Sequence, residues 1–241
     1  MPDFDIVTYC SGSYMEAFDA HIRSWLKNSK AKNIYVYTDV PVESFRINNK
    51  RVIIKPFYNK CDNWVTNVGR KTKCILNYLE KTNRKYFAFI EMDCYIVSDF
   101  SEVFDPEIDI SITRLFSTES YTHATITCGV WFAQVTPKLR QFMKQWHAAS
   151  RSYMKSKIGI TPSLIAYDQL SFTDMIRPAY VNQTFRVKAI DEHIYNCEHT
   201  KSEELLKQIE TETPKIIHFK GKRFKNKKHI QAIFNVLYPK K

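Results

Sequence analysis

The chain has 241 residues, of which 44% are hydrophobic, and its formal net charge is +11. This length and apolar share are enough for a packed core and exclude a disordered chain. The positive charge predicts a partner that carries phosphate: a nucleotide, a nucleic acid or an anionic lipid. No apolar run approaches the ~20 residues of a membrane span, and the N-terminus lacks the apolar region of a signal peptide.

Cysteines and glycines narrow the possibilities further. The six cysteines are scattered without a C-x-x-C pair, which indicates a reducing compartment, and we expect a cytoplasmic protein that can be peripheral to a membrane. The five glycines are too far apart to form a glycine-rich phosphate loop. If the chain binds a nucleoside diphosphate, a metal ion and lysines must therefore neutralise the phosphates.

The first hundred residues alternate between predicted strands and helices. Strands are predicted at 4–10, 33–38 and 51–56, and a helix is expected to begin at a capping box formed by Ser13 and Glu16. A second helix is predicted over 63–82, and the apolar run that begins at Tyr86 is read as a buried strand. This β-α-β-α-β order predicts a doubly wound, mostly parallel sheet that binds ligands at the carboxyl ends of its strands.

The strand that begins at Tyr86 runs into Glu91-Met92-Asp93. Because side chains alternate along a strand, Glu91 and Asp93 are expected on the same side. Two carboxylates at the mouth of a sheet suit a hard divalent cation that also holds phosphate oxygens. The alternative is a strand that ends in a solvated acidic turn.

The second half is less regular. Strands are predicted at 109–113, 125–132, 185–190 and 214–219, and helices are predicted from Thr136-Pro137, from Thr161-Pro162 to just before Pro178, from Ser202, and around 230–237. No linker, repeat or low-complexity segment interrupts the chain, so we expect one domain over 1–241.

Four segments in this order resemble the GT-A fold nucleotide-sugar glycosyltransferases, most closely the glycogenin-like family 8. They are residues 7–14, the Glu91-Met92-Asp93 triplet with the helix before it, Thr127-Cys128-Gly129-Val130 with the later Asp168-Gln169 pair, and residues 216–221. Glu91 replaces the aspartate that usually opens the acid-x-acid motif.

The resemblance implies an α/β GT-A fold, Rossmann-like, with a nucleotide-binding half at about 1–100 and an acceptor-side half at about 101–241. It implies transfer of a sugar from a nucleoside-diphosphate donor, UDP being favoured, to a glycan, protein or lipid-linked acceptor, with retention of anomeric configuration. The implied metal is Mn²⁺ or Mg²⁺, held by Glu91, Asp93 and His218. The implied donor-binding residues are Thr8, Tyr14, Lys73, Glu91, Gly221, Lys222 and Lys225, and the implied catalytic residues are Asp168 and Gln169.

Other interpretations remain open at this point. His193, Cys197 and His199 are spaced to reach one zinc ion, although no fourth ligand is evident. The basic and aromatic segment 219–228 could follow a nucleic-acid backbone or an anionic surface without catalysis, and a catalytically inactive fold could bind an anionic glycolipid. If transfer inverts the configuration instead, the candidate general bases are Asp99, Glu119 and Asp191.

Overall fold

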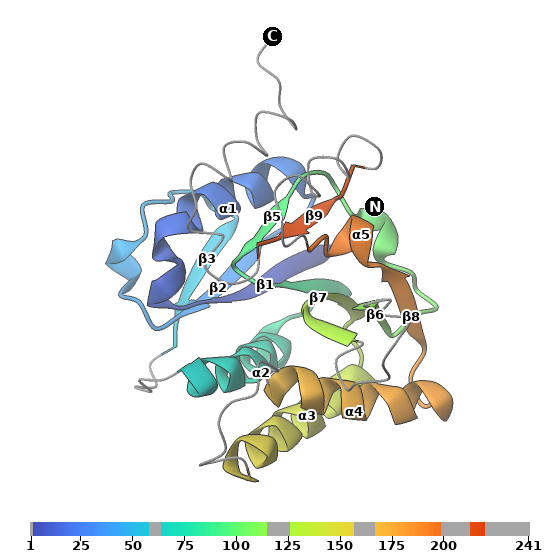
Figure 1. Cartoon of the computed structure of the whole chain (residues 1–241). Helices are drawn as coiled ribbons and strands as arrows, with labels where there is room; N and C mark the ends of the chain where they lie inside the picture. The colour runs from blue at the N-terminus through green and yellow to red at the C-terminus, as the bar shows by residue number, and fades with distance from the viewer. Residues whose placement is uncertain (1, 58–63, 115–125, 157–166, 199–212, 220–241) are drawn as a thin grey trace.

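A large central sheet organises the structure, a computed structural model that describes residues 2–57, 64–114, 126–156, 167–198 and 213–219. One face is covered by α1 and a small two-stranded sheet, and the other by α2, α3 and α4 (Figure 1). The helices are α1 (Met15–Asn28), α2 (Trp64–Lys81), α3 (Pro137–Ser156), α4 (Tyr167–Val181) and the short α5 (Glu192–Tyr195). The strands are β1 (Phe4–Cys10), β2 (Ile34–Thr38), β3 (Val52–Pro56), β4 (Tyr86–Ile90), β5 (Cys94–Ile96), β6 (Ile110–Arg114), β7 (Ile126–Gln134), β8 (Val187–Asp191) and β9 (Ile216–His218).

The seven strands of the large sheet follow the order β3-β2-β1-β4-β7-β6-β8. Strands β1 to β4 pair in parallel, as do β6 and β8, whereas β7 runs antiparallel to both of its neighbours. The predicted α/β fold with a mostly parallel central sheet and flanking helices is confirmed. The carboxyl ends of β1, β2 and β4 therefore meet at one edge, where ligands bind in sheets of this kind.

The core consists of two apolar layers because side chains alternate along each strand. In β1, Ile6 packs toward α1 while Val7 packs toward α2. The α2 side is rich in large aromatics, and the Trp131 ring lies 6.2 Å from that of Trp146 on α3 and 5.9 Å from that of Phe172 on α4. These contacts fix α3 and α4 against β7, and with them the start of α4.

The small sheet brings the end of the described chain to the middle of the molecule. β5 follows β4 after a short turn and pairs antiparallel with β9, with Cys94 opposite His218. Because directly opposed residues on paired strands project to the same face, His218 is carried beside residues that precede it by more than a hundred positions.

Two local expectations are wrong. The predicted capping box at Ser13 is absent: a 3₁₀ turn over Gly12–Tyr14 leads into α1, and no side chain caps the helix start. Pro178 does not end α4, which continues to Val181, because proline removes only one backbone donor and the next turn still closes through a bond from the Asn182 N–H to the Pro178 carbonyl. The helices expected from Ser202 and around 230–237 lie outside the described residues.

Asp109 connects three elements beneath the sheet edge. Its carboxylate accepts the Arg186 backbone N–H at 2.8 Å, just before β8, and the Lys138 ammonium of α3 at 3.2 Å. Burial by itself would raise the pKa of Asp109, but these two donors outweigh it and hold that pKa below its ordinary value.

The cysteines and the lengths of the helices can be compared with what the composition led us to expect. Each of the five cysteines in the described ranges is an unbridged, buried thiol, as expected of small apolar side chains in a core. Within the same ranges, no helix combines the length and the apolar character that crossing a membrane requires.

Candidate active site

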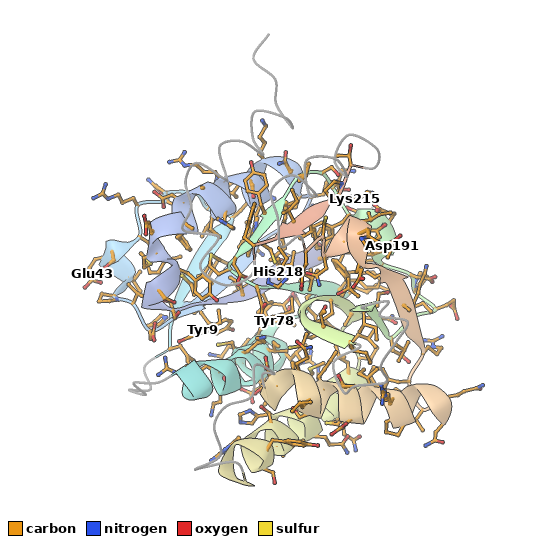
Figure 2. All side chains as sticks on the ribbon, in the orientation of Figure 1. Tyr9, Glu43, Tyr78, Asp191, Lys215 and His218 are labelled. Carbon is orange, nitrogen blue, oxygen red and sulfur yellow. The ribbon has the colours of Figure 1, made fainter. Side chains whose placement is uncertain are left out.

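Glu91, Met92 and Asp93 form a turn between β4 and β5 at the carboxyl end of the central strands. The predicted continuous strand is wrong here: β4 ends at Ile90, and the turn closes through a bond of 3.0 Å from the Cys94 N–H to the Glu91 carbonyl. The two carboxylates therefore converge because of a turn and not because of strand alternation. His218, the last residue of β9, lies toward the middle of the view (Figure 2).

His218 joins the two carboxylates. Its Nε2 atom lies 3.2 Å from Glu91 Oε2 and 3.2 Å from Asp93 Oδ1. Burial alone would lower the pKa of His218, but the charges of Asp93 and Glu91 outweigh it and raise that pKa to about 10. Asp93 Oδ1 is buried and has no well-aligned hydrogen bond within the described residues, so the contact with His218 is mainly electrostatic. A positive charge is therefore favoured between these carboxylates.

Asn196 fixes the orientation of the His218 ring. The Asn196 Nδ2 group donates to the hydroxyl of Thr127 at 2.8 Å and to that of Thr113 at 3.2 Å. Thr113 can in turn donate to the Val130 carbonyl at 3.2 Å. Because the Asn196 amide nitrogen faces the two threonines, its Oδ1 atom faces His218 and accepts from Nδ1 at 2.9 Å. This network directs Nε2 at the acidic turn, as an outer partner does for a metal-binding histidine.

Lys71 connects the acidic turn to the start of α4. Its ammonium lies 2.6 Å from Asp168 Oδ2, forms an ion pair with Glu91, and lies 3.5 Å from the Cys128 sulfur. Burial alone would lower the pKa of Lys71, but Asp168 and the other acidic neighbours raise it well above its ordinary value. Burial alone would have the opposite effect on an acid and raise the pKa of Glu91, but the charges of Lys71 and His218 hold that pKa below its ordinary value. Charge in this buried region is therefore balanced by close pairs.

Gly129 is required by the close approach of the site. A Cβ atom at this position would lie 2.6 Å from Glu91 Oε2 and 2.8 Å from His218 Cε1. The Gly129 carbonyl also accepts the Glu91 N–H at 2.9 Å, which holds β7 against the acidic turn. Glycine in a strand interior often marks such an approach of neighbouring groups.

Comparison with known proteins identifies the class to which this arrangement belongs. Over residues 15–231, the sequence matches the family described as nucleotide-diphospho-sugar transferases. The chain belongs to this family. The match does not assign family 8, which stays a prediction.

Among solved structures, this transferase is similar to a glycosyltransferase involved in the glycosylation of the major capsid of PBCV-1. The TM-score is 0.55 at 13% identity, over 95% of this chain and 100% of the other. At such identity the likeness speaks for the fold alone. No curated protein sequence matches the chain. Family and fold together make the protein a glycosyltransferase that uses a nucleotide-sugar donor.

The transferase brings several predicted site residues together. Glu91, Asp93 and His218 are in contact, and Asp168 reaches the same network through Lys71. Asp168 is fully buried in the first turn of α4, whereas Gln169 beside it is half-buried.

Tyr14 lies close to the acidic turn. It ends the 3₁₀ turn before α1 and is half-buried against the apolar layer on the α1 side. Burial and the nearby charges of Asp93 and Glu91 raise the pKa of Tyr14 well above its ordinary value.

Other predicted donor-binding residues are placed differently. Lys73 is exposed on α2, and Lys71, two residues earlier, is the lysine directed at the carboxylates. Thr8 is fully buried within β1 and makes none of the contacts that join Glu91, Asp93, His218, Lys71 and Asp168. Gly221, Lys222 and Lys225 lie outside the described residues, as does the basic segment apart from Phe219 at its start.

The rival sites gain no support. In the described ranges, the one group of three ligand-type side chains that could hold a metal ion is Asp93, Cys94 and His218. Of the alternative zinc ligands, His199 lies outside these ranges.

The candidate general bases are placed as follows. Asp99 pairs with Lys30 at 3.1 Å, and Asp191 accepts the His193 N–H at 2.8 Å. Glu119 lies outside the described residues.

Sequence reasoning missed four participants: Lys71, Cys94 in the metal-ligand group, Asn196, and Cys128, whose thiol donates to Asp168 at 3.2 Å. Lys71 and Lys73 are both helix lysines before the acidic turn, and only the rotation of α2 distinguishes them. Asn196 has no motif around it. Cys128 stood in the glycine segment, but nothing in the pattern indicated its partner.

Proposed function

We propose that this glycosyltransferase uses a UDP-sugar, requires Mn²⁺ or Mg²⁺, and transfers the sugar to a glycan, protein or lipid-linked acceptor with retention of configuration. The observation that carries the proposal is that His218 Nε2 lies 3.2 Å from Glu91 Oε2 and 3.2 Å from Asp93 Oδ1, at the carboxyl edge of the sheet. In sheets of this type, that edge is where nucleotides bind.

The residues present fit a divalent cation. Asp93 Oδ1 is a buried carboxylate oxygen without an aligned donor among the described residues. The charges of Asp93 and Glu91 raise the pKa of His218, so a positive charge is favoured between them, and a cation would supply one. Two carboxylates and an imidazole are a ligand set that manganese accepts. A cation bound here stabilises the negative charge that develops on the leaving diphosphate.

Two features support a uracil base. Tyr14 offers an aromatic ring next to the acidic turn. At the end of β2, Asp39 Oδ2 accepts from Tyr9 at 3.1 Å and from Arg70 at 2.6 Å, whereas its buried Oδ1 has no hydrogen bond within the described residues. Such an oxygen can accept the N3–H of uracil, a donor that cytosine lacks. Calorimetry should therefore find UDP binding more tightly than CDP, and equal affinities would refute the base assignment.

Asp168 is placed to act by charge and not as a base. Its Oδ2 atom already accepts from Lys71 and Cys128, and its Oδ1 atom accepts the Gln169 N–H at 2.9 Å. A carboxylate engaged in this way is poorly suited to take a proton from the acceptor. We assign it, with Gln169, to orienting the sugar and stabilising positive charge at the anomeric carbon.

The proposal of retention is supported by the engagement of the two candidate bases that the structure describes. Among the described residues, Asp99 and Asp191 are engaged elsewhere, and an inverting enzyme needs a base to deprotonate the acceptor. In a retaining site the leaving phosphate can take that proton on the same face. Proton NMR of the first product from an alpha-linked donor should show an alpha linkage, and a beta linkage would refute retention.

The six cations of residues 220–228 exceed the charge of one diphosphate, which favours an anionic acceptor or surface. Replacing Lys227 and Lys228 with glutamate should leave donor hydrolysis intact and lower transfer to an anionic acceptor. Equal loss of both activities would contradict this division.

The direct test compares two aspartates of one stretch. Asp93→Ala should abolish Mn²⁺-dependent donor turnover, and chelation of the parent protein should do the same. Asp99→Ala removes the ion pair with Lys30 and the hydrogen bonds from the Lys30 and Ser101 N–H groups, none of which involves the acidic turn, so it should leave turnover close to that of the parent. Turnover that survives excess chelator would refute metal dependence, and loss in Asp99→Ala would reopen the search for a base.

A further inference from the structure

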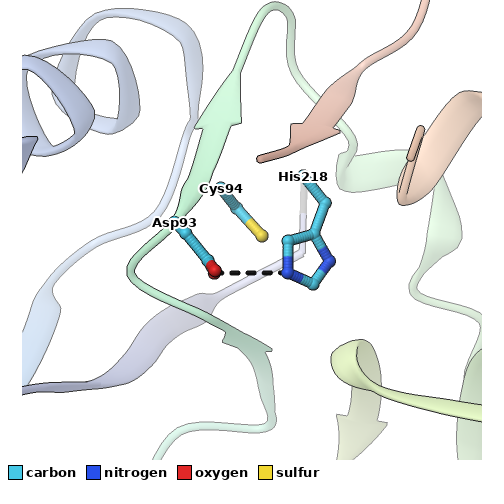
Figure 3. Close-up of side chains that lie close together, drawn as sticks. All are labelled: Asp93, Cys94 and His218. Atoms are coloured by element: carbon cyan, nitrogen blue, oxygen red, sulfur yellow. Dashed lines mark ion pairs between the residues drawn. The ribbon is translucent and has the colours of Figure 1, made fainter. Parts of the chain in front are cut away.

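Cys94 stands beside the proposed metal ligands in a way that the acid-x-acid motif does not require. It is the residue opposite His218 across the β5–β9 pair, and directly opposed residues project to one face. One ligand atom from each of Asp93, Cys94 and His218 lies within 4.8 Å of the other two. In Figure 3 the Cys94 sulfur points toward the His218 ring, next to the Asp93 carboxylate.

The position of this thiol is fixed by its own backbone. The Cys94 carbonyl accepts from His21 Nδ1 at 2.7 Å and from Trp25 Nε1 at 2.9 Å, both on α1. The Cys94 N–H donates to the Glu91 carbonyl at 3.0 Å. Since the residue is also fully buried, the sulfur cannot turn away into solvent.

An oxygen, a nitrogen and a sulfur together make a softer ligand set than oxygen and nitrogen alone. Thiolate sulfur favours zinc and similar ions, whereas magnesium and manganese prefer oxygen. Three protein ligands plus an open position is also a common arrangement for catalytic zinc. Sulfur at this point would therefore change which cation the site holds most tightly.

We propose that Cys94 is a further ligand of this site, so that thiophilic divalent cations such as Zn²⁺ and Cd²⁺ bind to Asp93, Cys94 and His218 and compete there with Mn²⁺. As the sulfur–metal bond forms, the thiol proton is released to solvent. This inference rests on the proposed function only for the location of the cation. The ligand assignment itself can be measured without any sugar transfer.

The first test titrates Cd²⁺ into the metal-free protein and follows the ultraviolet charge-transfer band of a cadmium–thiolate bond. The parent protein should show this band with one equivalent of Cd²⁺, and Cys94→Ser should lack it. Cys197→Ser is the matched control, because Cys197 is also a buried thiol and belongs to the rival zinc triplet. A band that survives in Cys94→Ser, or one that disappears in Cys197→Ser, would overturn the proposal.

Affinity gives a second, independent readout. Cys94→Ser should lower the affinity for Zn²⁺ about tenfold or more, at least the usual effect of losing a group that supports a metal. Mn²⁺ affinity, measured by electron paramagnetic resonance, should change far less, because the oxygen and nitrogen ligands remain. Equal losses for both ions would overturn the soft-ligand assignment.

Cadmium NMR of the unmutated protein tests the proposal without any variant, in case the serine variant does not fold. A resonance in the range of sulfur ligation supports it, and one in the range of oxygen and nitrogen ligation alone refutes it. Failure of the proposed function would look different: Mn²⁺ would not bind the parent protein or support turnover, while the cadmium–thiolate signal would persist.

Discussion

Substituting Gly129 with alanine adds one carbon atom at the most crowded point of the site. That atom would lie 2.6 Å from Glu91 Oε2 and 2.8 Å from His218 Cε1. To reach an ordinary contact of 3.4 Å, the Glu91 carboxylate must move by about 0.8 Å. Gly129 itself cannot recede, because it lies within β7 and its carbonyl is bonded to the Glu91 N–H.

The expected cost has two parts. Inserting a methyl group into a packed region typically destabilises a protein by about 1–3 kcal/mol. A misplacement of about 1 Å in a catalytic arrangement lowers the rate by about 100-fold. Gly129→Ala should therefore fold, unfold at a somewhat lower temperature, and lose roughly two orders of magnitude in turnover. The stabilisation of the fold by added Mn²⁺ should also be smaller, because the added methyl group presses against Glu91 and His218, two of the proposed metal ligands.

Gly12→Ala is the matched control. A Cβ atom at Gly12 would meet the Val40 Cγ2 atom at 3.8 Å, an ordinary contact. This variant should stay within about 0.5 kcal/mol of the parent in stability and keep its turnover. Thermal unfolding with and without Mn²⁺, together with turnover of the donor, measures both variants. If Gly129→Ala keeps parental turnover and parental stabilisation by Mn²⁺, the geometric argument for this glycine is refuted.

Three further predictions concern single side chains. Asp168→Asn should lower turnover far more than UDP affinity, and it should destabilise the fold by about 3–5 kcal/mol because Lys71 loses a buried partner. Adding Lys71→Met to this variant should restore stability but not turnover. Recovery of turnover in the double variant would contradict the role assigned to Asp168. Asn196→Ala should weaken Mn²⁺ binding about 10–100-fold by releasing the metal-site histidine, which paramagnetic resonance can measure; unchanged affinity would remove Asn196 from the site. The pKa of Asp109 is lowered in the folded state, so its contribution to stability is present above its ordinary value of 3.8 and is lost as the pH falls through the lowered value. Urea unfolding should then show a shallower acid-side fall for Asp109→Asn than for the parent, and parallel curves would argue against this linkage.

The sequence determined the elements and their order. Apolar runs and helical periodicity in the first hundred residues predicted strands β1 to β4 and helices α1 and α2 closely, because each pattern reflects which neighbouring residues of the same segment are buried together. The acidic turn and His218 also stood out, since their residue types and spacing limit the chemistry they can serve.

Tertiary structure alone decided which side chains meet. Lys71 and Lys73 look equivalent in sequence, and only the packing of α2 against the sheet turns Lys71 toward Glu91 and Asp168. Asn196 reaches His218 because the next residue, Cys197, bridges to Ile217 of β9 and accepts the His218 N–H at 3.0 Å. Contacts between residues twenty or more positions apart depend on how whole elements pack and pair, and local patterns do not encode that geometry.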